Sequence, residues 1–249
     1  MKLSELVKED KLKALIFGDA GAGKTTFSVS LPGPVLVLDF DKKITSAANY
    51  WADKKPEIIE NTEVKQFPMN KVNQDPYLKF RAIMDECDKQ VAEGKFKYNT
   101  VVLDSLTIYS EALMNHVIKT NPGIKRAIKD VASLQDYLVA ANLFKQDMGR
   151  FLDLPANCIA IGHVKRIQNE ETMEVKNQVL LSGSLANYAP KVFREVWYAS
   201  SSVEKDGKPI HKFLTRNNGK YECRTDIQKL PSIVQMDWET ISKYIGEQK

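Results

Sequence analysis

The chain has 249 residues, of which 43% are hydrophobic and 27% charged, a composition that allows a substantial buried core. No apolar run approaches the roughly 20 residues of a membrane-spanning helix, and the first residues lack the apolar stretch of a signal peptide. Three separated cysteines (Cys87, Cys158 and Cys223) indicate neither a disulfide framework nor a zinc site, which favours a cytoplasmic protein without a membrane partner. The net charge of +4 is compatible with a polyanionic partner but does not imply one.

Short apolar runs alternate with helical patterns along the chain. Buried strands are expected at 13–17, 35–38, 100–103, 158–161 and 192–199. A helix opens at Asp75-Pro76, with an N-cap and a proline in its first turn, and ends near Gly94. Ser133 and Asp136 resemble a capping box, ahead of a helix whose apolar positions include Leu134 and Leu138. Further helices are expected at 23–30, 106–119 and 236–245.

This alternation predicts an α/β fold, a mostly parallel sheet with helices on both faces. Turn signals at Asp206-Gly207 and Asn218-Gly219 predict two hairpins, whose antiparallel strands would join one edge of the sheet near the C-terminus. No repeat, low-complexity tract or linker divides the chain, so 1–249 is expected to be one domain. Within it, 1–11 would be an N-terminal extension and 203–249 would hold the hairpins and the last helix.

A glycine-rich segment between the first strand and the first helix matches the phosphate-binding P-loop pattern G-x-x-x-x-G-K-[ST] in full. Glycines let successive backbone N–H groups point at phosphate oxygens, and the helix adds its positive end. Lys24 is expected to reach the β- and γ-phosphates of ATP, and Thr25 to offer its hydroxyl to Mg²⁺. The predicted nucleotide-binding residues are Gly18, Asp19, Ala20, Gly21, Ala22, Gly23, Lys24, Thr25 and Thr26.

The strand at 100–103 ends on Asp104, which gives it the form of a Walker B segment. A carboxylate at a strand end can hold Mg²⁺ through the water shell that this ion retains. Alone the pattern is weak, but it gains weight because it follows a matched P-loop. Asp104 is therefore the second predicted metal-binding residue after Thr25.

Four segments together resemble the RecA-like recombinase core: LIFGDAGAGKTTF, VLVLDFDKK, KYNTVVLDSLTIYSEAL and CIAIGHVKR. They occur in that family's order over about residues 10–200. The resemblance is nearest to short phage nucleotide-binding proteins that act as single-strand annealing ATPases. It implies a RecA-like P-loop ATPase core that binds single-stranded DNA and is stimulated by it. It also implies a ring or filament of identical subunits with ATP at their interface.

The resemblance assigns roles to three further side chains. An acid just past the second strand activates the attacking water in such proteins, and Asp41 holds that place, where glutamate is usual. Asp39 is the substitute. His163, at the end of the strand 158–161, stands where a polar residue reports the γ-phosphate to a DNA-binding loop. Arg216 stands where a basic finger reaches the neighbour's ATP, with Lys212 and Lys220 as alternatives.

Two DNA-facing loops are implied at 119–131 and 164–182. The first carries Lys119, Lys125, Arg126 and Lys129, which could neutralise several phosphates. The second opens with Lys165 and Arg166, then turns acidic, and neither loop has an aromatic side chain for base stacking. The few residues before the first strand leave no room for an extra N-terminal domain, which favours annealing over strand exchange in recombination or repair.

Three other interpretations remain open at this level. A ring helicase or translocase motor uses the same core. A P-loop small-molecule kinase would need an arginine-rich lid, which the segments around 125 and 165 could imitate. A slowly hydrolysing nucleotide switch would accommodate the shorter Asp41.

Overall fold

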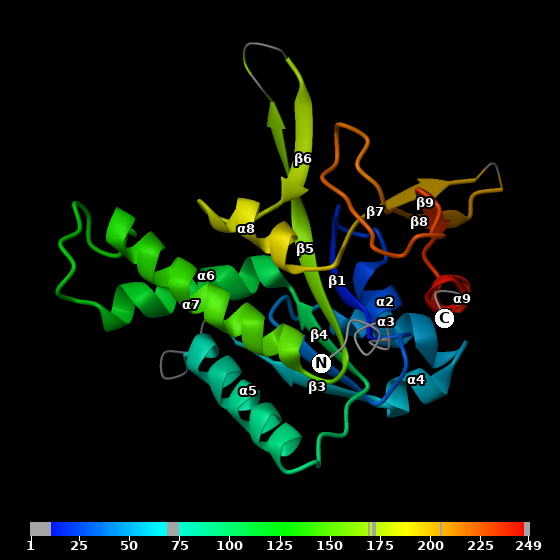
Figure 1. Ribbon diagram of the computed structural model, residues 1–249, viewed down its shortest axis with the longest axis horizontal. Coiled ribbons are helices and arrows are strands. Elements are labelled where there is room, and N and C mark those ends of the chain that lie inside the picture. Colours follow the sequence, from blue (N-terminus) through cyan, green and yellow to red (C-terminus); the bar gives the residue numbers. More distant parts are fainter. Residues whose placement is uncertain (1–10, 69–74, 169, 171–172, 205, 247–249) are drawn as a thin grey trace, which may run out of the picture.

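In a computed structural model, which describes residues 11–68, 75–168, 170, 173–204 and 206–246, one nine-stranded sheet forms the centre of the molecule. Its strand order is β3-β2-β4-β5-β1-β7-β8-β9, and β6 pairs with β5 outside this path (Figure 1). Residues 1–10 of the expected N-terminal extension lie outside the described residues.

All pairings from β3 to β7 along this path are parallel. These strands are β1 (Lys13–Gly18), β2 (Val35–Asp39), β3 (Thr62–Gln66), β4 (Thr100–Asp104), β5 (Asn157–Gln168) and β7 (Glu195–Val203). The antiparallel strands are β6 (Val175–Val179), β8 (Pro209–Leu214) and β9 (Ile233–Gln235). The prediction of a mostly parallel sheet with antiparallel strands at its C-terminal edge is confirmed.

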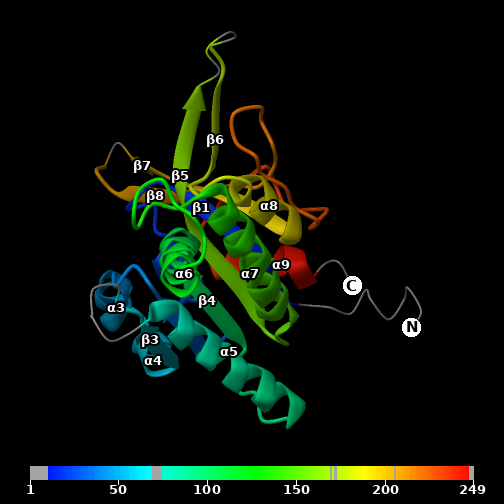
Figure 2. The same ribbon diagram turned by 90° about the vertical axis from the view of Figure 1, so that its left-hand side faces the viewer.

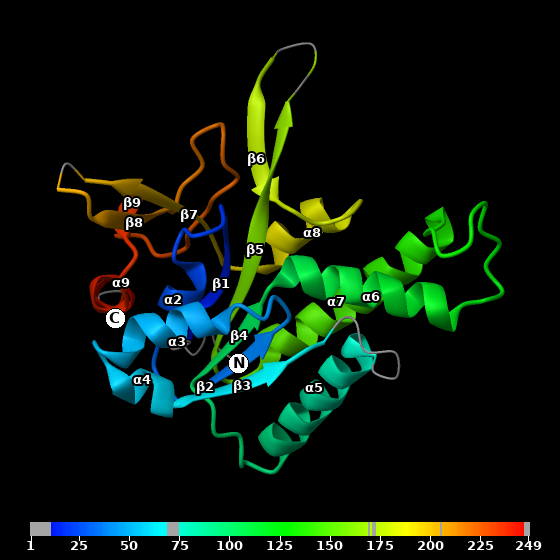
Figure 3. The same cartoon turned by 180° about the vertical axis from the view of Figure 1, so that it is seen from behind.

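Helices cover both faces of the sheet (Figures 1 and 3). On one face lie α5 (Pro76–Ala92), α6 (Leu106–Thr120), α7 (Leu134–Asp153) and α8 (Leu185–Val192). On the other lie α2 (Lys24–Ser28), α3 (Ile44–Ala52), α4 (Pro56–Glu60) and α9 (Trp238–Gly246). Strand residues alternate between the two cores: Leu15 and Phe17 join the first, Ala14 and Ile16 the second. The central strands β2 and β4 are almost entirely apolar up to their last residue because both of their faces are buried.

The predicted helix starts are found with their caps. Asp75 accepts hydrogen bonds from the N–H groups of Tyr77 and Leu78, and both halves of the Ser133–Asp136 capping box are formed. Leu134 and Leu138, two of the apolar positions of this helix, are nevertheless 78% and 60% exposed. The first turns of α7 run beside the end of α6, beyond the edge of the sheet, where no core is available (Figure 1).

The largest departure from expectation concerns 164–182. Instead of leaving the sheet as a loop after 158–161, β5 continues to Gln168 and pairs with β6, from Val164–Val179 to Gln168–Val175. The two strands form a ribbon that projects from the sheet (Figures 1 and 2). We call this segment, 164–179, the ribbon; residues 169, 171 and 172 in it lie outside the described part.

Other elements differ from the expected ones in detail. The hairpin at Asp206-Gly207 joins β7 and β8, but the turn at Asn218 leads into a long connection, 215–232, before β9. The segments 44–66 and 185–192 hold α3, α4, β3 and α8, which had no prediction. No helix in the described ranges is long and apolar enough to cross a membrane.

Candidate nucleotide-binding site

The P-loop connects β1 to α2 and needs glycine at two places for different reasons. At Gly18 a Cβ would lie 2.3 Å from the carbonyl oxygen of Ala199, so the neighbouring strand β7 leaves no space for a side chain. Gly23, just before α2, has a φ of 85°, which L side chains rarely adopt. Its missing side chain also makes room for the ring of His211, whose Nδ1 would lie 3.2 Å from a Cβ there.

Lys24 and Thr25 open α2 and point to two different partners. Lys24 is buried, and its ammonium donates to the carbonyl oxygens of Gly18 (2.8 Å) and Asp19 (2.7 Å). Burial lowers the pKa of Lys24, an effect that Asp104 and Asp19 oppose. The hydroxyl of Thr25 donates to Asp104 Oδ2 at 2.6 Å. The structure thus brings the predicted phosphate-binding lysine and both predicted metal-binding residues to one place.

Asp104 reaches this place because of the strand order. β5 lies between β1 and β4, so the ends of these three parallel strands are adjacent. Burial raises the pKa of the Asp104 carboxyl to about 6, with the Thr25 hydrogen bond opposing and the charges of Asp41 and Asp39 adding to the shift. A nearby cation would therefore be strongly favoured.

The oxygen atoms of Thr25 and Asp104 suit Mg²⁺, which prefers hard ligands and keeps several waters. No cluster of three or more His, Cys, Asp or Glu side chains with metal-binding geometry occurs in the described part of the chain. This pair therefore fits a metal that arrives with nucleotide phosphates rather than one held by a protein cage.

Asp41 follows β2 and is held by two donors. Ser105 donates its hydroxyl to Asp41 Oδ1 at 2.5 Å, and His163 Nε2 lies 3.0 Å from Asp41 Oδ2. Burial acts to raise the pKa of Asp41, but the contacts with His163 and Ser105 outweigh it, so the pKa lies below its usual value. The structure therefore joins Asp41 and His163, two residues 122 positions apart in the sequence.

Asp39, the alternative acid, points elsewhere. It is fully buried and accepts hydrogen bonds from the Lys42 N–H (2.7 Å) and Gln66 Nε2 (3.2 Å). Burial raises the pKa of Asp39, against these hydrogen bonds. Its carboxylate helps to shape the turn after β2 and does not line the pocket along the P-loop.

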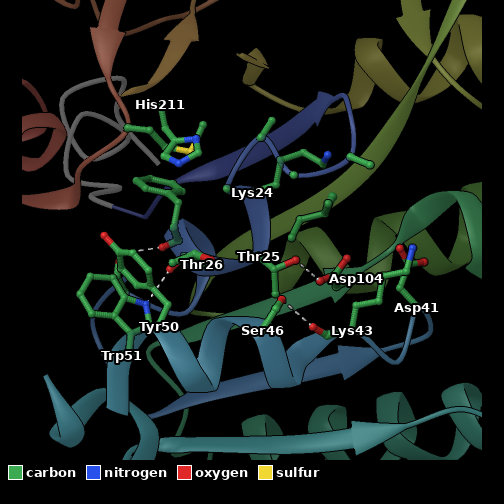
Figure 4. A pocket seen from close by; sticks show the side chains of 18 of the residues that line it. Lys24, Thr25, Thr26, Asp41, Lys43, Ser46, Tyr50, Trp51, Asp104 and His211 are labelled. Carbon is green, nitrogen blue, oxygen red and sulfur yellow. Dashed lines mark hydrogen bonds between the residues drawn. The ribbon is translucent and has the colours of Figure 1, made fainter. Parts of the chain in front are cut away.

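A pocket of about 500 Å³ runs along the P-loop and includes Asp41, Asp104 and His163 in its wall. Figure 4 shows that it extends past the phosphate-binding residues to Tyr50, Trp51 and His211. Trp51 Nε1 donates to the Thr26 carbonyl at 2.9 Å, which ties α3 to the end of the P-loop. Gln235, Met236 and Asp237 close the same end.

Sequence reasoning missed this second end of the pocket. Lys43, Tyr50 and Trp51 follow β2 closely, so an aromatic pair and a lysine just after the Asp41 segment were an available signal. His211 and Met236 carried no such signal because β8 and β9 reach the site only through the sheet order. His211 Nδ1 is buried and has no hydrogen-bond partner in the described part of the chain.

The remaining predicted residues lie outside the pocket. Arg216, at the end of β8, donates to the carbonyl oxygens of Gln228 and Leu230. Arg126 makes two hydrogen bonds, of 3.0 and 2.7 Å, to the buried carboxylate of Asp136, so its guanidinium is engaged within the protein. The other cations of the predicted DNA-binding set are exposed: Lys119, Lys125, Lys129, Lys165 and Arg166.

One comparison with known proteins, that with family models, agrees with this geometry. No curated protein matches the chain. A family model described as an AAA domain matches residues 10–221, which include every strand from β1 to β8 and the whole P-loop. Because the match spans most of the chain, the protein belongs to the AAA-domain family, a family of nucleotide-binding P-loop proteins that are in general ATPases.

Proposed function

We propose that the protein is an ATP-dependent, single-stranded-DNA-binding protein with a RecA-like core that promotes annealing or recombination. The observation that carries the proposal is the pair Asp41–His163. It lies beside the P-loop lysine in the pocket wall, and His163 stands where β5 leaves the pocket to become the ribbon. These two side chains therefore border both the nucleotide pocket and the base of the ribbon.

In this proposal Asp41 is the base for ATP hydrolysis. Its lowered pKa keeps the carboxylate ionised at neutral pH, as a group that orients and deprotonates water must be. Lys24, Thr25 and Asp104 would hold the phosphates and Mg²⁺, and the metal would supply charge neutralisation at the γ-phosphate. Lys43 adds a further positive charge to the same wall.

The base and ribose of ATP would occupy the end of the pocket at Tyr50, Trp51 and His211. Aromatic side chains suit a planar base, and the ring of His211 lines the same end of the pocket. This end lies next to Thr26, the last residue of the predicted nucleotide-binding set.

Single-stranded DNA would bind to exposed cations on the projecting segments. On the ribbon, Lys165 and Lys176 share a face, because Lys176 stands opposite Ile167, two residues from Lys165. Arg166 points to the other face. The connection between α6 and α7 offers Lys125 and Lys129 in addition.

Assembly into a ring or filament completes the proposal, with Arg216 acting on the ATP of a neighbouring copy. Its exposed position at the end of β8, outside its own pocket, is compatible with such a role in trans. A ring translocase would share all of these residues and would differ in producing directed movement along DNA.

The test is ATPase activity with and without single-stranded DNA, combined with particle mass in both states. We expect stimulation of turnover and a larger assembly when DNA and ATP are both present. Activity on small-molecule acceptors without any response to DNA would contradict the proposal and favour a kinase.

Lys24→Ala is the matching variant for the nucleotide site. Loss of the buried ammonium should weaken ATP binding tenfold or more, about 1.4 kcal/mol, measured by titration calorimetry. The control is Lys89→Ala, which removes an exposed lysine of α5 that does not line the pocket. Equal ATP affinity in both variants would remove the phosphate-binding role from Lys24.

A further inference from the structure

Thr107, in the first turn of α6, joins three elements through one buried hydroxyl. Its side chain is only 4% exposed. Thr107 Oγ1 donates to the carbonyl oxygen of Leu180, directly after β6, at 3.0 Å. It also accepts the N–H of His163 at 3.2 Å, and the N–H of Leu180 donates to the His163 carbonyl at 2.7 Å. The base of the ribbon is therefore fixed to α6 through this hydroxyl.

Thr107 ends a four-residue segment, 104–107, that also contacts the residues of the nucleotide pocket. It begins with Asp104, the predicted metal-binding residue, and continues with Ser105, which donates to Asp41. His163 completes a closed set of contacts: its side chain faces Asp41, while its backbone bonds to Thr107 and Leu180. A movement of Asp41 or His163 would therefore also move the base of the ribbon, because the backbone of His163 is hydrogen-bonded to both Thr107 and Leu180.

Close packing at this joint leaves little room for independent movement. A Cβ at Gly162, one residue before His163, would lie 2.5 Å from Cγ2 of Val179, so β6 approaches β5 as closely as a glycine allows. Val179 itself is 1% exposed. Packed groups of this kind change position together rather than one at a time.

We propose that Thr107 is a positioning residue that transmits the state of the nucleotide site to the ribbon. It does not line the pocket and acts through the backbone of His163. The inference rests on the proposed function, because it takes Asp41 and His163 as the groups that respond to ATP. In this proposal the hydroxyl of Thr107, rather than the packing of α6, couples the nucleotide site to the ribbon.

The experiment places a reporter on the ribbon. All three native cysteines are buried, so Ile167→Cys on the exposed ribbon surface can be labelled selectively with an environment-sensitive fluorophore. The labelled full chain is titrated with a non-hydrolysable ATP analogue and Mg²⁺, and two quantities are read: analogue affinity by calorimetry and the fluorescence change at saturation.

Three substitutions are compared in the labelled Ile167→Cys chain. Thr107→Val keeps the shape of the side chain and removes the hydroxyl, whereas Thr107→Ser keeps the hydroxyl. Ser110→Ala is the matched control, because Ser110 is a buried hydroxyl of the same helix that donates within α6, to the Thr107 carbonyl. Circular dichroism checks folding, and Thr107→Ala replaces the valine variant if the latter does not fold.

We expect Thr107→Val to reduce the fluorescence change about fivefold, the effect of removing one hydrogen bond, while analogue affinity stays within about twofold. Thr107→Ser and Ser110→Ala should behave like the parent chain. An unchanged fluorescence response in Thr107→Val overturns the proposal, as does an equal loss in Ser110→Ala. Analogue binding without any fluorescence change in the parent also overturns it. Failure of the parent to bind the analogue at all would instead reject the proposed function.

Discussion

Asp41 owes its position to backbone contacts as much as to its side chain. The carbonyl oxygen of Asp104 accepts the N–H groups of both Phe40 (2.5 Å) and Asp41 (3.2 Å), which fixes the end of β2 against the end of β4. Lys42 then takes a left-handed conformation, with a φ of 56°. An aspartate is one methylene shorter than the glutamate usual in RecA-like proteins, and this fixed backbone sets how far its carboxylate reaches.

Replacing Asp41 by asparagine tests the proposed base. Asp41→Asn keeps the size of the side chain but cannot accept a proton, so we expect kcat for ATP to fall about 100-fold or more. Affinity for a non-hydrolysable analogue should change little. The readout is steady-state turnover at saturating ATP, with analogue binding measured alongside.

Asp39→Asn is the matched control at the same strand end, since Asp39 does not line the pocket. Its turnover should stay near that of the parent chain. A large loss of kcat in Asp39→Asn together with normal turnover in Asp41→Asn would transfer the role of base to Asp39.

The start of α7 depends on one buried carboxylate. Asp136 accepts from Arg126 and from the backbone and hydroxyl of Ser133, and the first of these, the Arg126 hydrogen bond, is the main cause that lowers its pKa to about 2. Because the folded pKa lies below the ordinary value of 3.8, the ionised group stabilises the fold above that value. The stabilisation is lost as pH falls towards about 2.

Asp136→Asn should therefore lower the thermal midpoint at neutral pH. The gap between variant and parent should narrow as pH falls from about 4 to about 2, measured by melting curves across that range. Asp130→Asn serves as the control: it lies in the same connection, is exposed, and has a left-handed φ of 64° that asparagine tolerates. A constant gap at all pH values would rule out the ionised carboxylate as the source of stability.

Local signals in the sequence predicted much of this core. The P-loop, the strand ending on Asp104 and the Ser133–Asp136 capping box depend on neighbouring residues, whose pattern reports their structure directly. The Asp41–His163 contact could not be derived from spacing, because it arises from the sheet order, in which β4 lies between β2, which Asp41 follows, and β5, which carries His163. The family resemblance supplied those two residues without supplying their contact.

The ribbon and the second end of the pocket escaped prediction for physical reasons. Most of the ribbon lies outside the core: β5 is exposed from Lys165 to Gln168, and β6 buries only Asn177 and Val179, so the segment shows no regular apolar alternation. β3 is only half-buried, which hides it in the same way. His211 comes to the P-loop from β8, and only the completed sheet brings these segments together.

The two predicted DNA-binding stretches project in different directions from the molecule. The ribbon rises from the sheet beside β1, while the connection between α6 and α7 lies at the end of a helical hairpin (Figures 1 and 2). Arg126 is engaged by Asp136, which leaves Lys125 and Lys129 as the central cations of that connection. β5 runs through His163 into the ribbon, whereas within the described residues the α6–α7 connection is linked to His163 only through α6, by way of Thr107.

This difference predicts separate effects on binding of single-stranded DNA. Lys165→Gln with Arg166→Gln should reduce the slope of log affinity against log salt by about 0.7 for each DNA phosphate that the variant no longer neutralises. The ribbon pair should also reduce the dependence of DNA affinity on ATP. Lys125→Gln with Lys129→Gln should lower the salt slope but leave the ATP dependence intact, because this connection has no bonded contact with His163. Fluorescence anisotropy of a labelled oligonucleotide over a salt series, with and without ATP, measures both quantities.

Lys89→Gln with Lys95→Gln is the charge-matched control, since both lysines are exposed near the end of α5 and neither belongs to the projecting segments. Removing two charges there should change the salt slope far less than either other pair. An equal fall in the salt slope in all three double variants would mean that net charge alone attracts the DNA. A larger ATP effect from the α6–α7 pair would place the responding surface on that helical hairpin, and the contacts of Arg126 with Asp136 would then be the route to examine.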